Sequence, residues 1–217
     1  MKKFLTCFAA ADFLFVSACK KKDTSNNNSS SGGGGGNPPP PTGLSITTPC
    51  TVSATIGGSP FSFTEDGATY QVAVGSSGNV NTPPTPTDKI YSCDYYNDAT
   101  SQSIFSIQKG TLSFLGNIAD SATFTAFFPK TSYNYSTNAA NGIDISWWDA
   151  GNVQWSTGFG AATQTGSTFT VTEMISKKVL GYQDVKIKGT FNCTLYDGSG
   201  NSKTVTNGNF VAVFESL

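Results

Sequence analysis

Apolar and polar residues alternate with a period of two along most of the chain after residue 42, whereas the 3.6-residue period of an amphipathic helix is nearly absent. The clearest example runs from Asp184 to Tyr196, where apolar side chains point one way and lysine, threonine and asparagine side chains point the other. This alternation predicts a half-buried antiparallel strand with one face toward the core and one toward water. Gly189 interrupts the apolar row and indicates a bulge or a close approach of another backbone segment.

The same rule predicts ten further short strands, separated by turn-forming residues. They are residues 51–56, 61–64, 69–74, 89–96, 103–108, 111–115, 143–148, 152–156, 167–174 and 203–214. Hairpin turns are expected at Gly57-Gly58, Asp66-Gly67, Lys109-Gly110 and Asp197 to Asn201. Short helical turns are expected only at residues 120–128 and 173–180, and residues 75–88 are expected to form a long mobile loop. Closely spaced short strands predict an all-β fold, which we expect to be an antiparallel β-sandwich, with an up-and-down β-barrel as the alternative.

The first 18 residues depart from this pattern and resemble a bacterial lipoprotein signal peptide. Lys2 and Lys3 precede an apolar stretch from Phe4 to Val16, and small residues lead up to Cys19. The resemblance implies cleavage before Cys19 and attachment of lipid to its sulfur, which would anchor the protein to a membrane. The apolar stretch is too short for a transmembrane helix, which needs about 20 residues. An ordinary cleaved signal with an incidental cysteine is the other alternative.

Residues 19–42 consist mainly of lysine, serine, asparagine, glycine and proline, with no aliphatic or aromatic side chain to bury. Such a segment cannot offset the conformational entropy of ordering, so we expect a disordered linker. Residues 43–217 then form a single β-sandwich domain of ordinary size. The expected location is the cell envelope, lipid-anchored at the outer membrane, on either its periplasmic or its surface face.

The charged residues exclude several classes of function. The chain has no histidine, and its 13 basic residues are all lysine. Residues 43–217 hold eight lysines against twelve carboxylates, so the domain lacks the basic surface of a nucleic-acid binder. Without histidine, Ser-His-Asp chemistry, histidine-ligated zinc and histidine acid-base catalysis are unavailable. We expect no enzyme activity, cofactor or metal. Carboxylate-dependent glycan hydrolysis is the catalytic alternative.

Three cysteines remain in the domain once those of the signal and anchor are set aside. In an oxidising compartment they allow one disulfide and one free thiol. Alternation places Cys50 and Cys193 on the core-facing sides of their strands, and Cys93 alternates with Tyr91 and Tyr95. We expect a Cys50–Cys93 disulfide, with Cys50–Cys193 and three buried free thiols as the alternatives.

Several segments together resemble a group of small, uncharacterised bacterial lipoproteins. They are the lipidation signal with its trailing lysines, SATIGGSPFSF at residues 53–63, FTVTE at 169–173 and the closing strand pair at 185–214. Proteins of this group carry one β-rich domain of unknown function after a disordered linker. The resemblance implies a fold type and an envelope location, and it brings no catalytic residues.

Aromatic residues in the second half of the domain indicate a ligand-binding surface. Alternation from Ile143 buries Trp147 and leaves Trp148 on the opposite face together with Asp144. An exposed tryptophan beside carboxylates and amides suits a sugar ring, whose apolar face stacks on the indole. The expected ligand-binding residues are Trp148, Trp155, Tyr133, Tyr135 and Asp144. The sequence thus predicts a membrane-tethered binding module for a glycan or an envelope protein, with a purely structural surface module as a further alternative.

Overall fold

Eleven strands and one short helix make up the secondary structure of the described residues in the computed structural model. That described part covers residues 43–100, 102–136, 142–159 and 163–217. The predicted signal peptide at residues 1–18, the lipidation site Cys19 and the linker at 19–42 lie outside it. Among the described residues, no helix is both long enough and apolar enough to cross a membrane.

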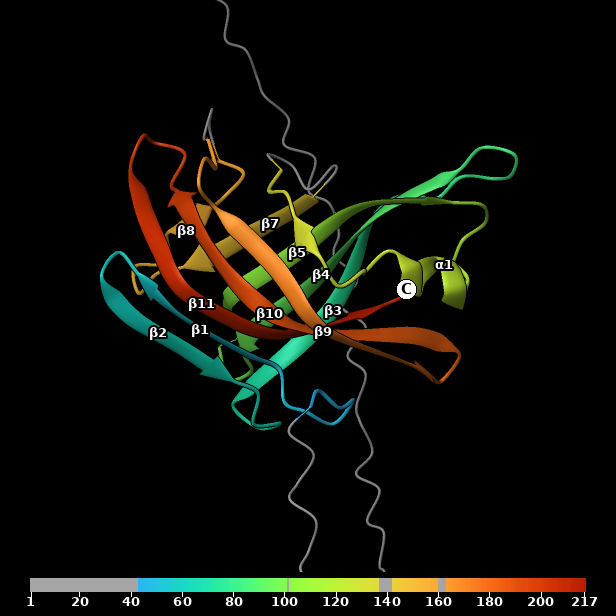
Figure 1. The fold of residues 1–217 in the computed structure, drawn as a ribbon, viewed down its shortest axis with the longest axis horizontal. Coiled ribbons are helices and arrows are strands. Elements are labelled where there is room, and N and C mark those ends of the chain that lie inside the picture. Colours follow the sequence, from blue (N-terminus) through green and yellow to red (C-terminus); the bar gives the residue numbers. More distant parts are fainter. Residues whose placement is uncertain (1–42, 101, 137–141, 160–162) are drawn as a thin grey trace, which may run out of the picture. The chain divides into compact units, whose positions relative to one another are not determined.

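The strands and the helix follow one another along the chain with short connections (Figure 1). They are β1 (Thr51–Ile56), β2 (Ser59–Thr64), β3 (Tyr70–Asn79), β4 (Thr87–Asn97), β5 (Gln102–Phe114), α1 (Ser121–Ala126), β6 (Ser132–Tyr133), β7 (Gly142–Trp148), β8 (Gln154–Ser156), β9 (Thr168–Val179), β10 (Tyr182–Tyr196) and β11 (Ser202–Glu215).

All paired strands belong to one antiparallel sheet in the order β2-β1-β11-β10-β8-β7-β5-β4-β3, and β9 pairs with β10 and β6. The all-β antiparallel prediction is therefore confirmed. The sheet curls into a half-barrel, so its two halves face each other across the core as the layers of a sandwich do (Figure 1). Its edge strands β2 and β3 are neighbours in sequence but are not hydrogen-bonded to each other. The sheet therefore has a seam between β2 and β3.

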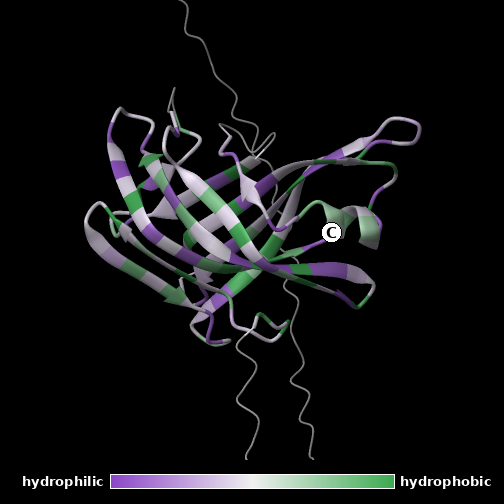
Figure 2. Ribbon diagram, in the orientation of Figure 1, coloured by the Kyte–Doolittle hydropathy of each residue, from purple (hydrophilic) through white to green (hydrophobic). Residues whose placement is uncertain are grey.

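The core fills the concave side of this sheet, because the apolar half of each alternating strand points inward. Figure 2 shows hydrophobic and hydrophilic residues alternating along the strands. Aromatic rings from distant strands are in contact in the core. The ring centroids of Phe105 of β5 and Phe191 of β10 are 5.9 Å apart, and Phe169 of β9 stacks on Phe210 of β11 with a centroid distance of 4.6 Å. Offset and edge-on ring pairs of this kind stabilise a core beyond the area that they bury.

The predicted features of the Asp184 to Tyr196 strand are confirmed. Its apolar row faces the core, and the register with β9 shifts between Lys188 and Gly189. A Cβ atom on Gly189 would lie 2.0 Å from the carbonyl oxygen of Thr170. The glycine is therefore required by the close approach of the neighbouring backbone. The helix expected within residues 120–128 is also present, as α1, and Asp120 caps its first turn.

Two predicted hairpins are wrong. Lys109 and Gly110 lie inside the continuous strand β5, since the pairing with β4 continues across them with a local shift in register. Asp66-Gly67 joins β2 to β3 at the seam and forms no hairpin, because these strands do not pair. A glycine-containing dipeptide marks a change in backbone direction or a bulge, and the sequence alone does not distinguish the two.

Two further predictions are corrected. The segment 173–180, expected as a helical turn, belongs mostly to β9, whose last residue is Val179. The long loop expected at residues 75–88 is short, because β3 extends to Asn79 and β4 begins at Thr87. Serine and glycine have low strand propensity, but ladder hydrogen bonds to β4 hold Gly75 to Asn79 in the sheet.

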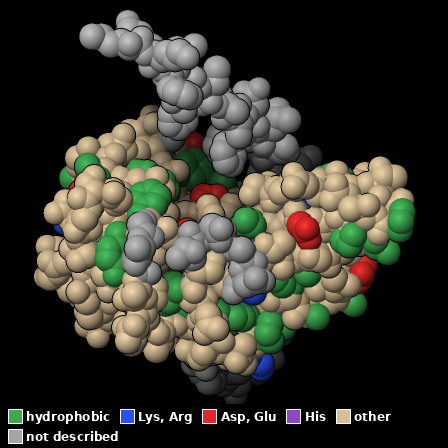
Figure 3. All heavy atoms as spheres, turned by 90° about the horizontal axis from the view of Figure 1, so that it is seen from above, with side chains coloured by type: hydrophobic (Ala, Val, Ile, Leu, Met, Phe, Trp, Pro, Cys, Tyr) green, Lys and Arg blue, Asp and Glu red, His purple; other side chains and the backbone are tan. Residues whose placement is uncertain are grey.

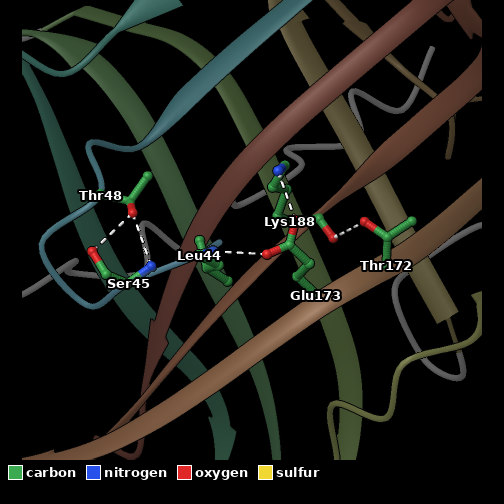
Figure 4. A network of polar contacts seen from close by, with 6 residues as sticks. All are labelled: Leu44, Ser45, Thr48, Thr172, Glu173 and Lys188. Atoms are coloured by element: carbon green, nitrogen blue, oxygen red, sulfur yellow. Dashed lines mark hydrogen bonds and ion pairs between the residues drawn. The ribbon is translucent and has the colours of Figure 1, made fainter. Parts of the chain in front are cut away.

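The segment leading into β1 is held against the convex side of β9 and β10 by polar contacts (Figure 4). Glu173 accepts a hydrogen bond from the Leu44 N–H group at 2.7 Å and forms an ion pair with Lys188 at 2.7 Å. Lys186 donates to the carbonyl oxygens of Ile46 and Thr48 at 2.8 and 2.5 Å. These contacts fix the point at which the chain enters the domain.

Candidate functional site

Trp148 lies at the end of β7 on the convex face of the sheet. The register explains this position: Trp147 is opposite Phe105 on one side and Trp155 on the other, and it packs edge-on against Phe61 at the core. Neighbouring residues of a strand point to opposite faces, so Trp148 points outward, opposite Gln154. The predicted directions are therefore confirmed: Trp147 points toward the core and Trp148 points away from it. Each tryptophan is half-buried.

An open recess of about 640 Å³ lies beside Trp148. It is lined by Thr100 before β5, by Gln102 and Ser103 at the start of β5, and by Ala150, Gly151 and Asn152 from the β7–β8 turn. The Gln102 amide donates to the side-chain oxygen of Asn152 at 2.9 Å. The recess thus combines one large aromatic surface with hydroxyl and amide groups, and none of the described residues that line it is charged.

Asp149 builds the turn that carries Asn152. Its Oδ1 atom accepts hydrogen bonds from the backbone N–H groups of Gly151 and Val153, and its Oδ2 atom accepts from the indole N–H of Trp155 at 3.0 Å. These bonds, the one from Val153 first, hold the pKa of Asp149 below its usual value. Asn152 adopts a φ of 61°, which asparagine tolerates better than most residues. The Asp149 carboxylate therefore fixes the backbone of the β7–β8 turn and, with it, the position of Asn152.

Asp144 lies on the same face of β7 as Trp148, as predicted by the alternation. Its Oδ1 atom accepts hydrogen bonds from Ser156 and Thr157 at 2.8 Å each. Burial raises the pKa of Asp144, and the two hydroxyl groups oppose that shift. Between Asp144 and Trp148, the Gln154 amide donates to Ser146 at 3.3 Å. A row of polar side chains therefore extends from the recess along β7 and β8.

Three of the predicted ligand-binding residues lie elsewhere. Trp155 is 8% exposed on the core face, with the Lys203 ammonium 4.3 Å from its ring centroid. Tyr133 and Tyr135 pack against Phe169, and Tyr135 donates to the carbonyl oxygen of Asn192 at 3.0 Å. These three residues stabilise the fold and do not join Trp148 at the recess.

Sequence reasoning missed Gln102 and Asn152. The alternation predicts a strand that begins at Asn152, and Gln102 lies 46 residues before Trp148, so only the pairing of β5 with β7 brings Gln102 close to Trp148. The surface around the domain also carries few charges. In Figure 3 most of the visible face is uncharged side chain and backbone, and charged side chains are scattered singly.

The Asp197 to Asn201 turn is a compact hairpin connection between β10 and β11. Asp197 accepts hydrogen bonds from the N–H groups of Ser199 and Asn201 at 2.8 and 3.0 Å, which occupies its Oδ1 atom. Within the described residues, no group of three or more cysteine and acidic side chains is placed to hold a metal ion. No residue of this turn is therefore assigned to a ligand site.

All three cysteines of the domain are buried free thiols, and they lie in two places. Burial raises the pKa of Cys93, and the neighbouring Cys50 raises it further. Cys193 lies instead beside Tyr135, and burial raises the pKa of Cys193 to about 12. Of the two pairings considered, Cys50 with Cys93 is the one that the fold brings into contact.

Comparison of the chain with protein-family models, with curated proteins and with solved structures finds no match.

Proposed function

We propose that the domain is a non-enzymatic binding module that recognises a glycan at the recess beside Trp148. The observation that carries this proposal is the combination of a half-buried indole with the amide groups of Gln102 and Asn152 in one uncharged recess. A pyranose ring presents an apolar face and a rim of hydroxyl groups. The indole offers the apolar face a partner, and the amides offer both donors and acceptors to the hydroxyls.

The chemistry of the site supports a neutral ligand of modest affinity. An open recess buries less of a ligand than a deep pocket does, so we expect dissociation constants of about 10 μM to 1 mM, or about −4 to −7 kcal/mol. The described residues that line the recess are all uncharged, which disfavours a strongly anionic polymer, for which lysine side chains would be the usual partners.

The test is binding of the purified protein to a panel of neutral and acidic polysaccharides, followed by calorimetry on any that bind. We expect Trp148→Ala to weaken binding at least tenfold, because tryptophan anchors commonly contribute about 1.4 kcal/mol or more. Gln102→Ala should weaken it less, since its hydrogen bonds exchange with those of water. Tyr182→Ala is the matched control, because that exposed aromatic lies on the β9–β10 hairpin outside the recess. Binding that is equal in Trp148→Ala and Tyr182→Ala would exclude the recess as the site.

Hydrolysis by a pair of carboxylates has weaker support. Asp94 and Asp144 point to the same convex face and both have pKa values raised by burial. Asp94 pairs with Ser106, and Ser106 pairs with Ser146, two residues from Asp144. Two strand spacings and two residues put the aspartate Cα atoms about 12 Å apart. Glycosidases leave two carboxyl groups about 5–9.5 Å apart free to act on the substrate, whereas Asp94 and Asp144 each already accept hydrogen bonds from two hydroxyl groups. Polysaccharide hydrolysis that is lost in Asp144→Asn would reverse this preference.

We further propose that the module is tethered to the cell envelope through lipid on Cys19, with residues 19–42 as the spacer. This part rests on the sequence pattern alone. Mass spectrometry of the protein from its native membrane should find a chain that begins at Cys19 and carries acyl groups. A chain that retains Met1 and carries no lipid would contradict it.

A further inference from the structure

Cys50 and Cys93 lie on opposite sides of the seam. Cys50 immediately precedes β1, which is next to the edge strand β2, and Cys93 lies in β4, which is next to the edge strand β3. Since β2 and β3 do not pair, side-chain contacts across the core must hold these two margins of the sheet together.

The contacts around the two thiols are specific. Thr51 pairs with Val211 of β11, which places Cys50 beside the next residues of that strand. Tyr95, two residues beyond Cys93 on the same face of β4, donates its hydroxyl to the carbonyl oxygen of Val211 at 2.9 Å. The Cys93 thiol lies close enough to Cys50 and to the backbone of Val213 for both to shift its pKa. β4 therefore crosses β11 at the point where Cys50 enters the sheet.

Burial isolates the pair. Cys50 is 1% exposed and Cys93 is fully buried, and Tyr95 is fully buried beside them. Cys193, in contrast, lies on β10 next to Tyr135. Cys50 and Cys93 are therefore each other's neighbouring thiol.

We infer that Cys50 and Cys93 form a disulfide bond that closes the seam of the half-barrel covalently, with Cys193 left as a free thiol. The bond joins the two margins of the sheet that lack hydrogen bonds to each other. It closes a loop that contains β1, β2, β3 and most of β4, so it restricts a large part of the unfolded chain.

The chemistry needs a disulfide oxidant such as oxidised glutathione. The Cys50 thiolate attacks one sulfur of the oxidant and releases one glutathione thiolate, and the Cys93 thiolate then attacks Cys50 and releases the second. Two protein thiols are oxidised, one glutathione disulfide is reduced, and the two released thiolates take up the two protons. Because the thiolate is the reactive form and the folded core keeps both thiols from solvent, the exchange takes place during folding.

The experiment is to refold the full chain in a glutathione redox buffer, to alkylate the remaining thiols with iodoacetamide in denaturant so that buried thiols also react, and to map the peptides without reduction. We expect a peptide pair linked through Cys50 and Cys93, and an alkylated Cys193. Full-chain mapping also reports Cys7 and Cys19 separately. The urea midpoint of the oxidised protein should fall when the bond is reduced.

The variants separate the bond from the fold. Cys193→Ser should keep the linked pair, whereas Cys50→Ala should yield alkylated Cys93 and a urea midpoint that no longer responds to reduction. If Cys50→Ala fails to fold, the map of Cys193→Ser still decides. Alkylation of Cys50 and Cys93 in refolded wild-type protein, or a bond from either to Cys193, would overturn the inference.

Discussion

Lys109 shows how a single residue works against the stability of this fold. Its side chain lies on the core side of β5, 7% exposed, with the ammonium 3.8 Å from the ring centroid of Phe127 and 4.5 Å from that of Tyr133. No described residue gives it a hydrogen bond or an ion pair, so the aromatic faces are its favourable contacts. Burial lowers the pKa of Lys109 to about 8. The Lys109 ammonium therefore loses its hydration and gains no ion pair with a carboxylate, which disfavours the folded state.

This pKa predicts how stability depends on pH. The ordinary pKa of a lysine is 10.5, so between about pH 8 and pH 10.5 the unfolded chain binds more protons than the folded one. The free energy of unfolding should therefore rise with pH through that window, and the full penalty should be present below pH 8. Lys109→Met removes the charge, and we expect it to stabilise the protein at pH 7 by about 1–3 kcal/mol, since one pKa unit corresponds to about 1.4 kcal/mol.

Urea denaturation at pH 7 and pH 9.5 measures this effect. The wild-type protein should gain more stability between the two pH values than Lys109→Met does. Lys178→Met is the matched control, because Lys178 is exposed near the tip of the β9–β10 hairpin and should change stability by less than about 0.5 kcal/mol. A Lys109→Met protein that is less stable than wild type at pH 7 would show that the cation–π contacts outweigh desolvation.

At the scale of elements, Lys186 attaches the segment before β1 to the sheet. Lys186 is 5% exposed and donates to two backbone carbonyl groups of that segment. Lys186→Met should cost about 1–3 kcal/mol, because it leaves those carbonyls without their charged partner. Lys188→Met removes only the half-exposed ion pair with Glu173 and should cost less than about 1 kcal/mol. Thermal or urea denaturation of the two variants gives the comparison, and equal losses would contradict the role assigned to Lys186.

Strands could be predicted from the sequence wherever a complete alternating row was present. β1 begins and ends as predicted, and β10 and β11 differ by two residues or fewer at each end. The errors fall where propensity and pairing disagree. The serine and glycine residues that end β3 have no apolar row of their own, and the ladder with β4 alone makes them a strand. Gly110 has the composition of a turn, but it pairs with Gly142 in the middle of the sheet.

The candidate site was predictable only in part, for a similar reason. The side-chain period of two placed Trp148 and Asp144 on one face, because that inference needs only one strand. Grouping Trp155, Tyr133 and Tyr135 with them used nearness in sequence. The structure separates them: Trp155 pairs with Trp147 on the core face, and Tyr133 belongs to the sheet margin formed by β6 and β9. Tyr135 bridges Ile143 of β7 through its backbone, but its ring packs against Phe169 of β9. Contacts between strands depend on register and strand order, which periodicity does not contain.

At the scale of the whole molecule, the seam is the part of the barrel that depends most on side chains. Phe63 of β2 is 5% exposed and lies 5.4 Å from the Tyr70 ring of β3 and 5.2 Å from the Tyr95 ring of β4. These ring contacts cross the seam where the backbone makes no ladder. Elsewhere each strand is held by backbone pairing as well as packing, so loss of one side chain has a smaller local effect.

Phe63→Ala should therefore open the molecule at the seam before it unfolds elsewhere. We expect a loss of about 3–5 kcal/mol, as for other buried phenylalanines replaced by alanine. Hydrogen exchange should quicken first in β2 and β3, because local opening follows the elements with the fewest remaining contacts, while β10 stays protected between β9 and β11. Leu180→Ala, at a residue that is 94% exposed on a hairpin tip, should leave both stability and exchange unchanged. If Phe63→Ala quickened exchange equally in β10 and in β3, the sheet would open as one cooperative unit, and the seam would have no independent weakness for a Cys50–Cys93 bond to correct.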